Sequence, residues 1–161
     1  MDSDSYRQIM RHQAGAVAII AVGRAGERAG LTATAVCSLS DSPPMLLVCV
    51  NRKASAHDPI ANTGAFSVNL LANTQQDVAG CFSGRTGLKG EARFNDPDWT
   101  TLTTGAPILA SALASLDCKL VDRHEFATHS VFIGAIADGR VNAEAAPLLY
   151  FRGDFWDLGR S

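Results

Sequence analysis

The sequence contains the uncharged stretch Gly30-Leu-Thr-Ala-Thr-Ala-Val-Cys-Ser-Leu-Ser40, which also lacks large aromatic rings. In a single strand, alternation would place Leu31, Ala33, Ala35, Cys37 and Leu39 on one face and Thr32, Thr34, Val36, Ser38 and Ser40 on the other. A solvent-facing strand usually carries Lys, Glu or Arg on its outer row. We therefore expect a strand buried on both faces, whose row of small hydroxyls meets a flat ligand with a polar edge.

The length and charge of the chain limit its class. A chain of 161 residues has the size of one ordinary domain, so we expect residues 1–161 to form a single domain. The formal net charge of -2 and the pI near 6.0 predict neither a nucleic-acid partner nor an anionic membrane partner. The apolar run at residues 14–22 is too short to span a membrane, and we interpret it as the first strand rather than a signal peptide.

The metal-binding residue types show no ligand spacing. Cys37, Cys49, Cys81 and Cys118 stand singly inside apolar runs, without a C-x-x-C pair. This favours reduced cysteines and a cytoplasmic location, although the alternative of two disulfides stays open. The histidines at 12, 57, 124 and 129 show no zinc spacing either, so we expect no metal site.

The remaining pattern predicts many strands and few helices. We expect short helices at residues 3–12, from Ser55 to Gly64, and from Thr74 to about residue 83, with Ser55 and Thr74 as caps. Strands are expected at residues 14–23, 30–40, 45–51, 65–71, 113–123, 129–141, 147–153 and 155–158. Residues 84–107 lack periodicity and predict a long functional loop. About six to eight strands at hairpin spacing predict a mainly β (α+β) fold, a closed or split antiparallel barrel.

Familiar catalytic motifs are absent. The sequence has no G-x-x-x-x-G-K-[ST], G-x-G-x-x-G, H-E-x-x-H or G-x-S-x-G segment, which disfavours nucleotide-loop proteins, zinc proteases and serine hydrolases. Phe82, Tyr150 and Trp156 could stack on a ligand ring, but aromatics at strand spacing are more often core residues. Core packing is likewise favoured over reactivity for Cys37.

Three polar residues keep two interpretations each. Ser55 either caps a helix or, with the free N–H groups of the first turn and Arg52 or Arg85, binds a phosphate; local sequence favours the cap. His129, at the start of a strand, either faces a pocket, where it would titrate near neutral pH, or is exposed without a role. Asn69 lies in an apolar strand and needs hydrogen-bond partners from the backbone or from a ligand.

Seven segments follow one another along nearly the whole chain: Gly30 to Ser40, Ser42-Pro-Pro-Met-Leu-Leu-Val-Cys-Val-Asn51 with Ser55, Phe66-Ser-Val-Asn-Leu-Leu71, Cys81-Phe-Ser-Gly-Arg85, Gly105-Ala-Pro-Ile-Leu109, His129-Ser-Val-Phe-Ile-Gly134 and Pro147-Leu-Leu-Tyr-Phe-Arg-Gly153. In these segments and in their order, the sequence resembles the short flavin reductases of two-component monooxygenase systems. The resemblance implies an antiparallel Greek-key split β-barrel of the FMN-binding type. It also implies a homodimer that reduces FMN or FAD with NADH or NADPH.

The resemblance also implies site residues. His129 would lie near the nicotinamide as the catalytic residue, and Ser55 with the following helix start would hold the phosphate. The full set of implied cofactor-binding residues is Thr32, Ala33, Thr34, Ala35, Cys37, Ser38, Cys49, Val50, Asn51, Ser55, Asn69, Phe82, Ser83, Arg85, His129, Tyr150 and Arg152.

Hydride transfer needs stacked rings more than an acid or a base, which agrees with the missing catalytic motifs. The expected function is therefore an NAD(P)H:flavin oxidoreductase that supplies reduced flavin to a separate flavin-dependent monooxygenase. The alternatives are a reductase that acts directly on a bulky acceptor, as corrin reductases do, and a non-catalytic flavin-binding protein. Val36 and Cys37 depart from the aromatic and hydroxyl residues common in the family at these places.

Overall fold

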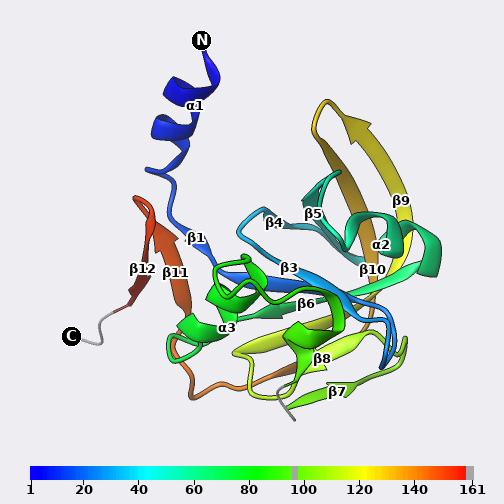
Figure 1. Ribbon diagram of the computed structural model, residues 1–161. Coiled ribbons are helices and arrows are strands. Elements are labelled where there is room, and N and C mark those ends of the chain that lie inside the picture. Colours follow the sequence, from blue (N-terminus) through cyan, green and yellow to red (C-terminus); the bar gives the residue numbers. More distant parts are fainter. Residues whose placement is uncertain (96–97, 159–161) are drawn as a thin grey trace.

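The computed structural model of the protein describes residues 1–95 and 98–158 (Figure 1). Within these ranges it contains twelve strands, three α-helices and one 3-10 helix. All strand pairs are antiparallel. The predicted class, a mainly β antiparallel fold with a few short helices, is confirmed, although the strands are more numerous than the expected six to eight.

The largest sheet has seven strands in the spatial order β3-β2-β6-β9-β10-β5-β4. Their bounds are β2 (Ala18–Val22), β3 (Ala29–Ala33), β4 (Val36–Asp41), β5 (Pro44–Asn51), β6 (Ala65–Leu70), β9 (Ala114–Phe126) and β10 (His129–Val141). The edge strands β3 and β4 follow each other in the chain, separated only by Thr34 and Ala35. A flat sheet of this width would hold its edges about 29 Å apart, whereas the chain from residue 33 to residue 36 spans at most about 11 Å. The sheet therefore curls into a barrel that is split between β3 and β4.

The prediction of one continuous strand from Gly30 to Ser40 is wrong. The chain turns at residues 34–35, where the N–H of Val36 donates to the carbonyl oxygen of Thr34 at 3.0 Å. The prediction that both faces are buried is also wrong for β4, since Cys37 and Ser38 are exposed and Leu39 is 47% exposed. The reason is that β4 is an edge strand, paired only with β5.

Strand β2 is buried on both faces and separates two apolar clusters. Ile20 points into the barrel interior, where it joins Phe66 and Phe132. Ile19, one residue earlier, packs on the outer face in a second cluster that contains Phe82. Alternation along one strand thus builds both the barrel interior and the layer that supports the loop region.

The smaller elements lie around the barrel. They are helices α1 (Ser3–Met10), α2 (His57–Thr63), α3 (Gln76–Phe82) and η1 (Gly90–Phe94), the sheet β1 (Gly15–Ala16), β11 (Leu148–Phe151) and β12 (Asp154–Asp157), and the hairpin β7 (Trp99–Thr101) with β8 (Pro107–Leu109). Helix α1 projects from the body and has no buried residue (Figure 1). In the part of the chain that the structure describes, no helix has the length and apolarity to cross a membrane.

The helix caps differ from the sequence prediction at their N-termini. The N-cap residues are Ala56 for α2 and Gln75 for α3, and neither makes a side-chain capping bond, so the caps predicted at Ser55 and Thr74 are wrong. The Gln75 side chain instead accepts from the N–H of Ala72 at 2.8 Å, a contact within the preceding turn. The predicted end of α2 is confirmed, because Gly64 adopts the left-handed conformation with φ of 69°.

The region expected to be one long loop, residues 84–107, contains η1 and β7, and β8 begins at its last residue; residues 96–97 lie outside the described residues. Arg93 ties this region to the barrel: Nε donates to the carbonyl oxygen of Leu88 at 2.8 Å, and Nη1 donates to those of Gly30 and Phe82 at 3.1 and 3.2 Å. The segment is therefore pinned against the start of β3 and the end of α3.

Candidate active site

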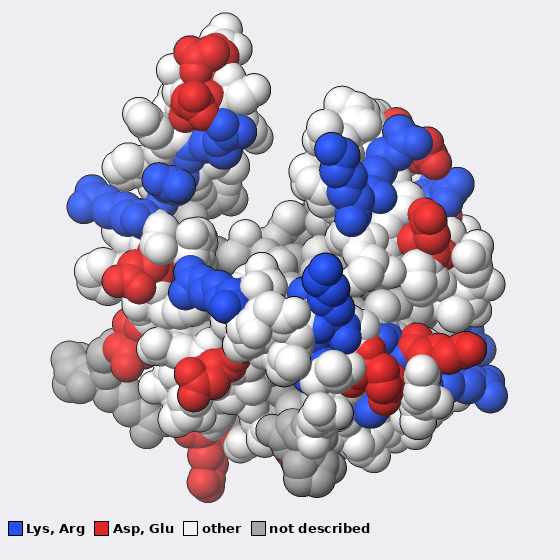
Figure 2. Space-filling view, viewed as in Figure 1, with Lys and Arg blue, Asp and Glu red and all other residues white. Residues whose placement is uncertain are grey.

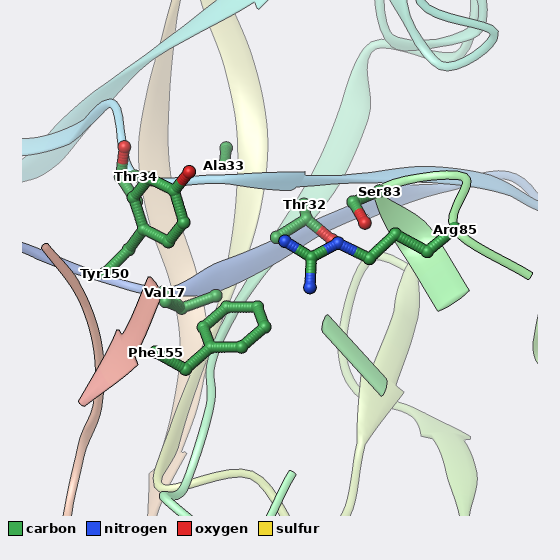
Figure 3. A pocket seen from close by; sticks show the side chains of 8 residues that line it. All are labelled: Val17, Thr32, Ala33, Thr34, Ser83, Arg85, Tyr150 and Phe155. Atoms are coloured by element: carbon green, nitrogen blue, oxygen red, sulfur yellow. The ribbon is translucent and has the colours of Figure 1, made fainter. Parts of the chain in front are cut away.

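A pocket of about 220 Å³ opens at the split of the barrel, beside the end of β3 (Figure 3). Its lining residues are Val17, Thr32, Ala33, Thr34, Ser83, Arg85, Tyr150 and Phe155. The ring of Tyr150 stands beside Thr34, and the guanidinium of Arg85 lies 5.3 Å from the centre of the Phe155 ring. The pocket is smaller than the roughly 300–1,000 Å³ typical of sites for whole ligands, so it suits one ring system rather than an entire dinucleotide.

The hydroxyl groups around this pocket are not equivalent. Thr32 Oγ1 donates to the carbonyl oxygen of Ala79 in α3 at 2.7 Å, and Ser83 Oγ donates to that of Gly80 at 2.9 Å. Since each hydroxyl has one proton, these two can only accept from a ligand. Thr34 and Tyr150 make no side-chain hydrogen bond with the residues the structure describes, so both remain able to donate.

A second group of predicted residues lies along β5 and β10. His129 pairs with Asn51, and Cys49 pairs with Val131, so the residues with odd numbers share one row across the two strands. The N–H of Cys49 donates to the carbonyl oxygen of Ala35 at 3.0 Å, which joins this row to the residues at the split. Neither His129 nor Asn51 lines the 220 Å³ pocket.

The exposed side chain of His129 has one ring nitrogen engaged. Its Nδ1 lies 2.9 Å from Thr128 Oγ1, and Nε2 makes no hydrogen bond within the described part of the chain. This leaves Nε2 available to a ligand that lies over the row.

The turn between β5 and α2 carries Ser55. Asn51 Oδ1 accepts from the N–H of Lys53 at 2.9 Å, which fixes the first part of the turn. The hydroxyl of Ser55 is exposed and makes no side-chain hydrogen bond within residues 1–95 and 98–158. Arg52, considered above as a phosphate ligand, lies 3.5 Å from the carboxylate of Glu125 instead.

Two further pockets adjoin the first. A pocket of about 380 Å³ shares Thr34 and Tyr150 with it and is also lined by Ala35 and by α1. A pocket of about 670 Å³ shares only Thr34 with the first pocket and is also lined by Ser38. Figure 2 shows basic side chains on both sides of the hollow between α1 and the far end of the β9–β10 hairpin. Acidic side chains lie beside them on both sides, and Arg7, Arg52 and Arg123 form ion pairs with carboxylates.

Three predicted cofactor-binding side chains lie buried in the protein interior. Asn69 is 0% exposed, and its amide donates to Ser67 Oγ at 2.9 Å while its Oδ1 accepts from the N–H of Leu109 at 2.9 Å, so the protein interior satisfies it without a ligand. Phe82 packs against other core rings, and Val50 is 0% exposed inside the barrel, where only its backbone can approach a ligand.

Six other predicted residues also lie outside the three pockets described above: Cys37, Cys49, Asn51, Ser55, His129 and Arg152. Cys37 is exposed on the edge strand β4. Arg152 occupies the β11–β12 turn with φ of 54°; its N–H donates to the carbonyl oxygen of Arg11 at 2.7 Å, and its guanidinium covers the Phe151 ring. Arg152 therefore holds the end of α1 and does not line the ring-sized pocket.

Sequence reasoning missed three residues near the site. Val17 and Phe155 line the 220 Å³ pocket, yet each reads as a core residue because it stands among apolar neighbours. Lys53 is exposed in the Ser55 turn and has no ion pair within the described residues. A lysine two residues before Ser55 was a usable signal for a phosphate site.

Two groups with shifted pKa values, Glu91 and Cys118, do not line the three pockets. Hydrogen bonds from the Arg28 side chain lower the pKa of Glu91 to about 2, against partial burial, and Arg28 Nε lies 2.8 Å from Glu91 Oε1. Burial raises the pKa of the Cys118 thiol to about 12, with a smaller contribution from Asp117. No group of metal-ligating side chains occurs within the described ranges.

Comparison with known proteins identifies the family. Residues 10–159 match the flavin reductase like domain, so the chain belongs to the flavin reductase-like family. A relative from Methylorubrum extorquens (strain PA1), named FMN reductase (NADH) RutF 2, is 44% identical over 150 residues, which cover 93% of this chain and 86% of the relative.

Solved structures agree with this assignment. BorF, the flavin reductase component of a bacterial two-component tryptophan halogenase, superimposes with a TM-score of 0.91 at 32% identity, covering 99% of this chain and 100% of that one. The NADH:FAD oxidoreductase SgcE6 of Streptomyces globisporus C-1027, in complex with NAD and FAD fragments, gives a TM-score of 0.89 at 27% identity, covering 98% and 93%. The split-barrel expectation is therefore confirmed.

Proposed function

We propose that this protein is an NAD(P)H:flavin oxidoreductase that reduces FMN or FAD and supplies reduced flavin to a separate monooxygenase. The observation that carries the proposal is the ring-sized pocket at the split of the barrel, in a chain that belongs to the flavin reductase-like family. Relatives named FMN reductase (NADH) support the activity and favour FMN and NADH as the pair. The flavin reductase component of a tryptophan halogenase supports a separate oxygenase partner.

The flavin fits the residues present. The pocket offers apolar walls for a flat ring from Val17 and Phe155, and hydroxyl groups at its rim from Thr34 and Tyr150. When bound, a flavin accepts the hydride of the nicotinamide at its N5 atom, and this chemistry belongs to the two cofactors. The protein contributes to the rate by holding the flavin and nicotinamide rings in contact and by excluding water.

Each remaining group has a proposed role. The Ser55 hydroxyl and the Lys53 amine bind the flavin phosphate, because the β5–α2 turn presents both without another partner in the described chain. His129 uses Nε2 to orient the nicotinamide while Thr128 holds Nδ1. Arg85 approaches the flavin from the end of α3.

We also propose a cytoplasmic homodimer in which residues 1–161 form one domain. Four free cysteines support a reducing compartment. Tyr6 and Ile9 on α1 are 56% and 57% exposed on a helix with no buried residue, and a second copy of the chain would cover them. Sedimentation analysis measures this directly, and a monomer at working concentration contradicts it.

The first test of the function is oxidation of NADH and NADPH by the purified protein with and without added FMN or FAD. Gel filtration after turnover shows whether flavin stays bound. Turnover that rises with added flavin, with reduced flavin released, supports the proposal. Flavin binding without oxidation of either nicotinamide refutes it in favour of a carrier, and turnover only with another acceptor favours a direct reductase.

The role of His129 is tested by His129→Ala. Turnover should fall while flavin affinity stays unchanged, because the residue is assigned to the nicotinamide. His124→Ala is the matched control, since His124 is an exposed histidine of the same hairpin, held by Asp122 at 3.0 Å. Equal activity of the His129 variant and the control removes the assignment.

A further inference from the structure

His57, the first residue of α2, is a buried histidine with a partner on each ring nitrogen. It is 4% exposed; Nδ1 lies 2.7 Å from Asp58 Oδ1, and Nε2 lies 2.8 Å from Ser130 Oγ. The Asp58 carboxylate only accepts, so Nδ1 donates to it, and Nε2 forms the hydrogen bond with the Ser130 hydroxyl. The edge contact with Phe132, at 5.3 Å between ring centres, fixes the ring plane.

This order of serine, histidine and aspartate is not a hydrolytic triad. Ser130 is 0% exposed, and none of the three residues lines any of the three pockets described above. A nucleophile has to reach its substrate. The hydrogen bonds therefore serve to hold one segment against another.

The two segments carry the proposed phosphate and nicotinamide groups. Ser130 directly follows His129 on β10, and His57 stands two residues after Ser55. The other end of the same turn is also fixed to β10, since Asn51 pairs with His129 and the N–H of Arg52 donates to the carbonyl oxygen of Thr128 at 2.9 Å. The turn at residues 51–57 is thus tied to the start of β10 at both ends.

We propose that His57 is a positioning residue of the flavin reductase site, which acts through Ser130 to hold the Ser55 turn at a fixed place beside His129. The inference rests on the proposed function, because it assigns the flavin phosphate to this turn. The buried hydrogen bond between His57 and Ser130 can hold the Ser55 turn in place, because its loss would leave a buried polar atom unsatisfied and let the turn move.

The test compares FMN with riboflavin, which has the same ring system and no phosphate. Ser130→Ala removes the partner of Nε2 and should lower the ratio of FMN affinity to riboflavin affinity by about tenfold, the scale of a hydrogen bond to a charged group. The side-chain amide of His57→Gln can form a hydrogen bond with the Ser130 hydroxyl through its oxygen or its nitrogen, so this variant should keep much of the wild-type ratio. Should Ser130→Ala fail to fold, Asp58→Ala is measured instead, because the Asp58 side chain is 81% exposed and only its contact with Nδ1 is lost.

Thr63→Ala is the matched control. Thr63 Oγ1 donates to the carbonyl oxygen of Pro59 at 2.9 Å, so this variant also loses a hydrogen bond of α2, at the end away from β10. It should lower thermal stability without changing the affinity ratio. An unchanged ratio in a folded Ser130→Ala or Asp58→Ala variant overturns the inference, as does an equal fall in Thr63→Ala. Wild-type protein without nicotinamide-dependent flavin reduction refutes the proposed function itself, a separate outcome.

Discussion

Gly30 opens the stretch that leads to the split of the barrel, and we expect it to tolerate no side chain. A Cβ at this position would lie 2.8 Å from Phe82 Cε1 and 3.0 Å from the carbonyl oxygen of Ile20. Phe82 is 3% exposed, and its ring packs against Phe94 and Trp99 at centre distances of 4.9 and 5.5 Å. The Phe82 ring therefore has no free space into which it could move away from the added Cβ.

The magnitude follows from these distances. Carbon atoms pack best at about 3.5–4.0 Å, so Gly30→Ala forces a shift of about 0.7 Å or more. Strain of this kind in a packed core costs about 1–3 kcal/mol of the free energy of unfolding. Gly80→Ala, within α3 itself, is the control: its nearest atom is Arg85 Cδ at 4.0 Å, and alanine in a helix interior is favoured by about 0.5–1 kcal/mol.

Urea unfolding of both variants measures the two changes, which should have opposite signs. In a Phe82→Leu background the smaller side chain leaves room, and Gly30→Ala should cost at least about 1 kcal/mol less than in the wild type. A Gly30→Ala variant within about 0.5 kcal/mol of the wild type would refute the reasoning.

Three other predictions concern ionisation, thiols and a buried amide. The pKa of Glu91 is lowered from 4.5 to about 2, so its bonds with Arg28 stabilise the folded state above pH 4.5, and this contribution is lost as the pH falls toward 2. The free energy of unfolding of Glu91→Gln should therefore depend less on pH in this range than that of the wild type. Identical acid-unfolding curves for the two proteins contradict the assignment. In native protein, Cys37 should react with a thiol reagent while Cys118, with its pKa raised to about 12, reacts only on unfolding, as peptide mapping of the labelled protein will show. Asn69→Ala should cost roughly 1–3 kcal/mol of stability yet leave turnover per folded molecule unchanged, whereas lost turnover in folded protein would return Asn69 to the site.

Local sequence accounts for much of the secondary structure. The apolar run before Asn51 became β5, and Gly64 ends α2 because it can adopt a positive φ. Capping was predicted less well, since the hydroxyl of Ser55 stays free in the structure and the helix begins after it. A capping pattern shows which local bond is available, but it does not show that His57, the first residue of this helix, bonds to Ser130 on a distant strand.

The sequence by itself determined which segments alternate, that several consecutive strands pair as hairpins, and which polar residues have no obvious structural role. Tertiary structure decided where those residues meet. The two-residue alternation of a strand shows which face of the strand a residue occupies, but it does not show which other strand lies alongside or where the chain turns. The turn at Thr34 and Ala35 exists because the seven-stranded sheet curls until its two edges are joined by two residues. Tyr150, from the end of the chain, lies beside Thr34 because β11 pairs with β1, where Gly15 is opposite Tyr150.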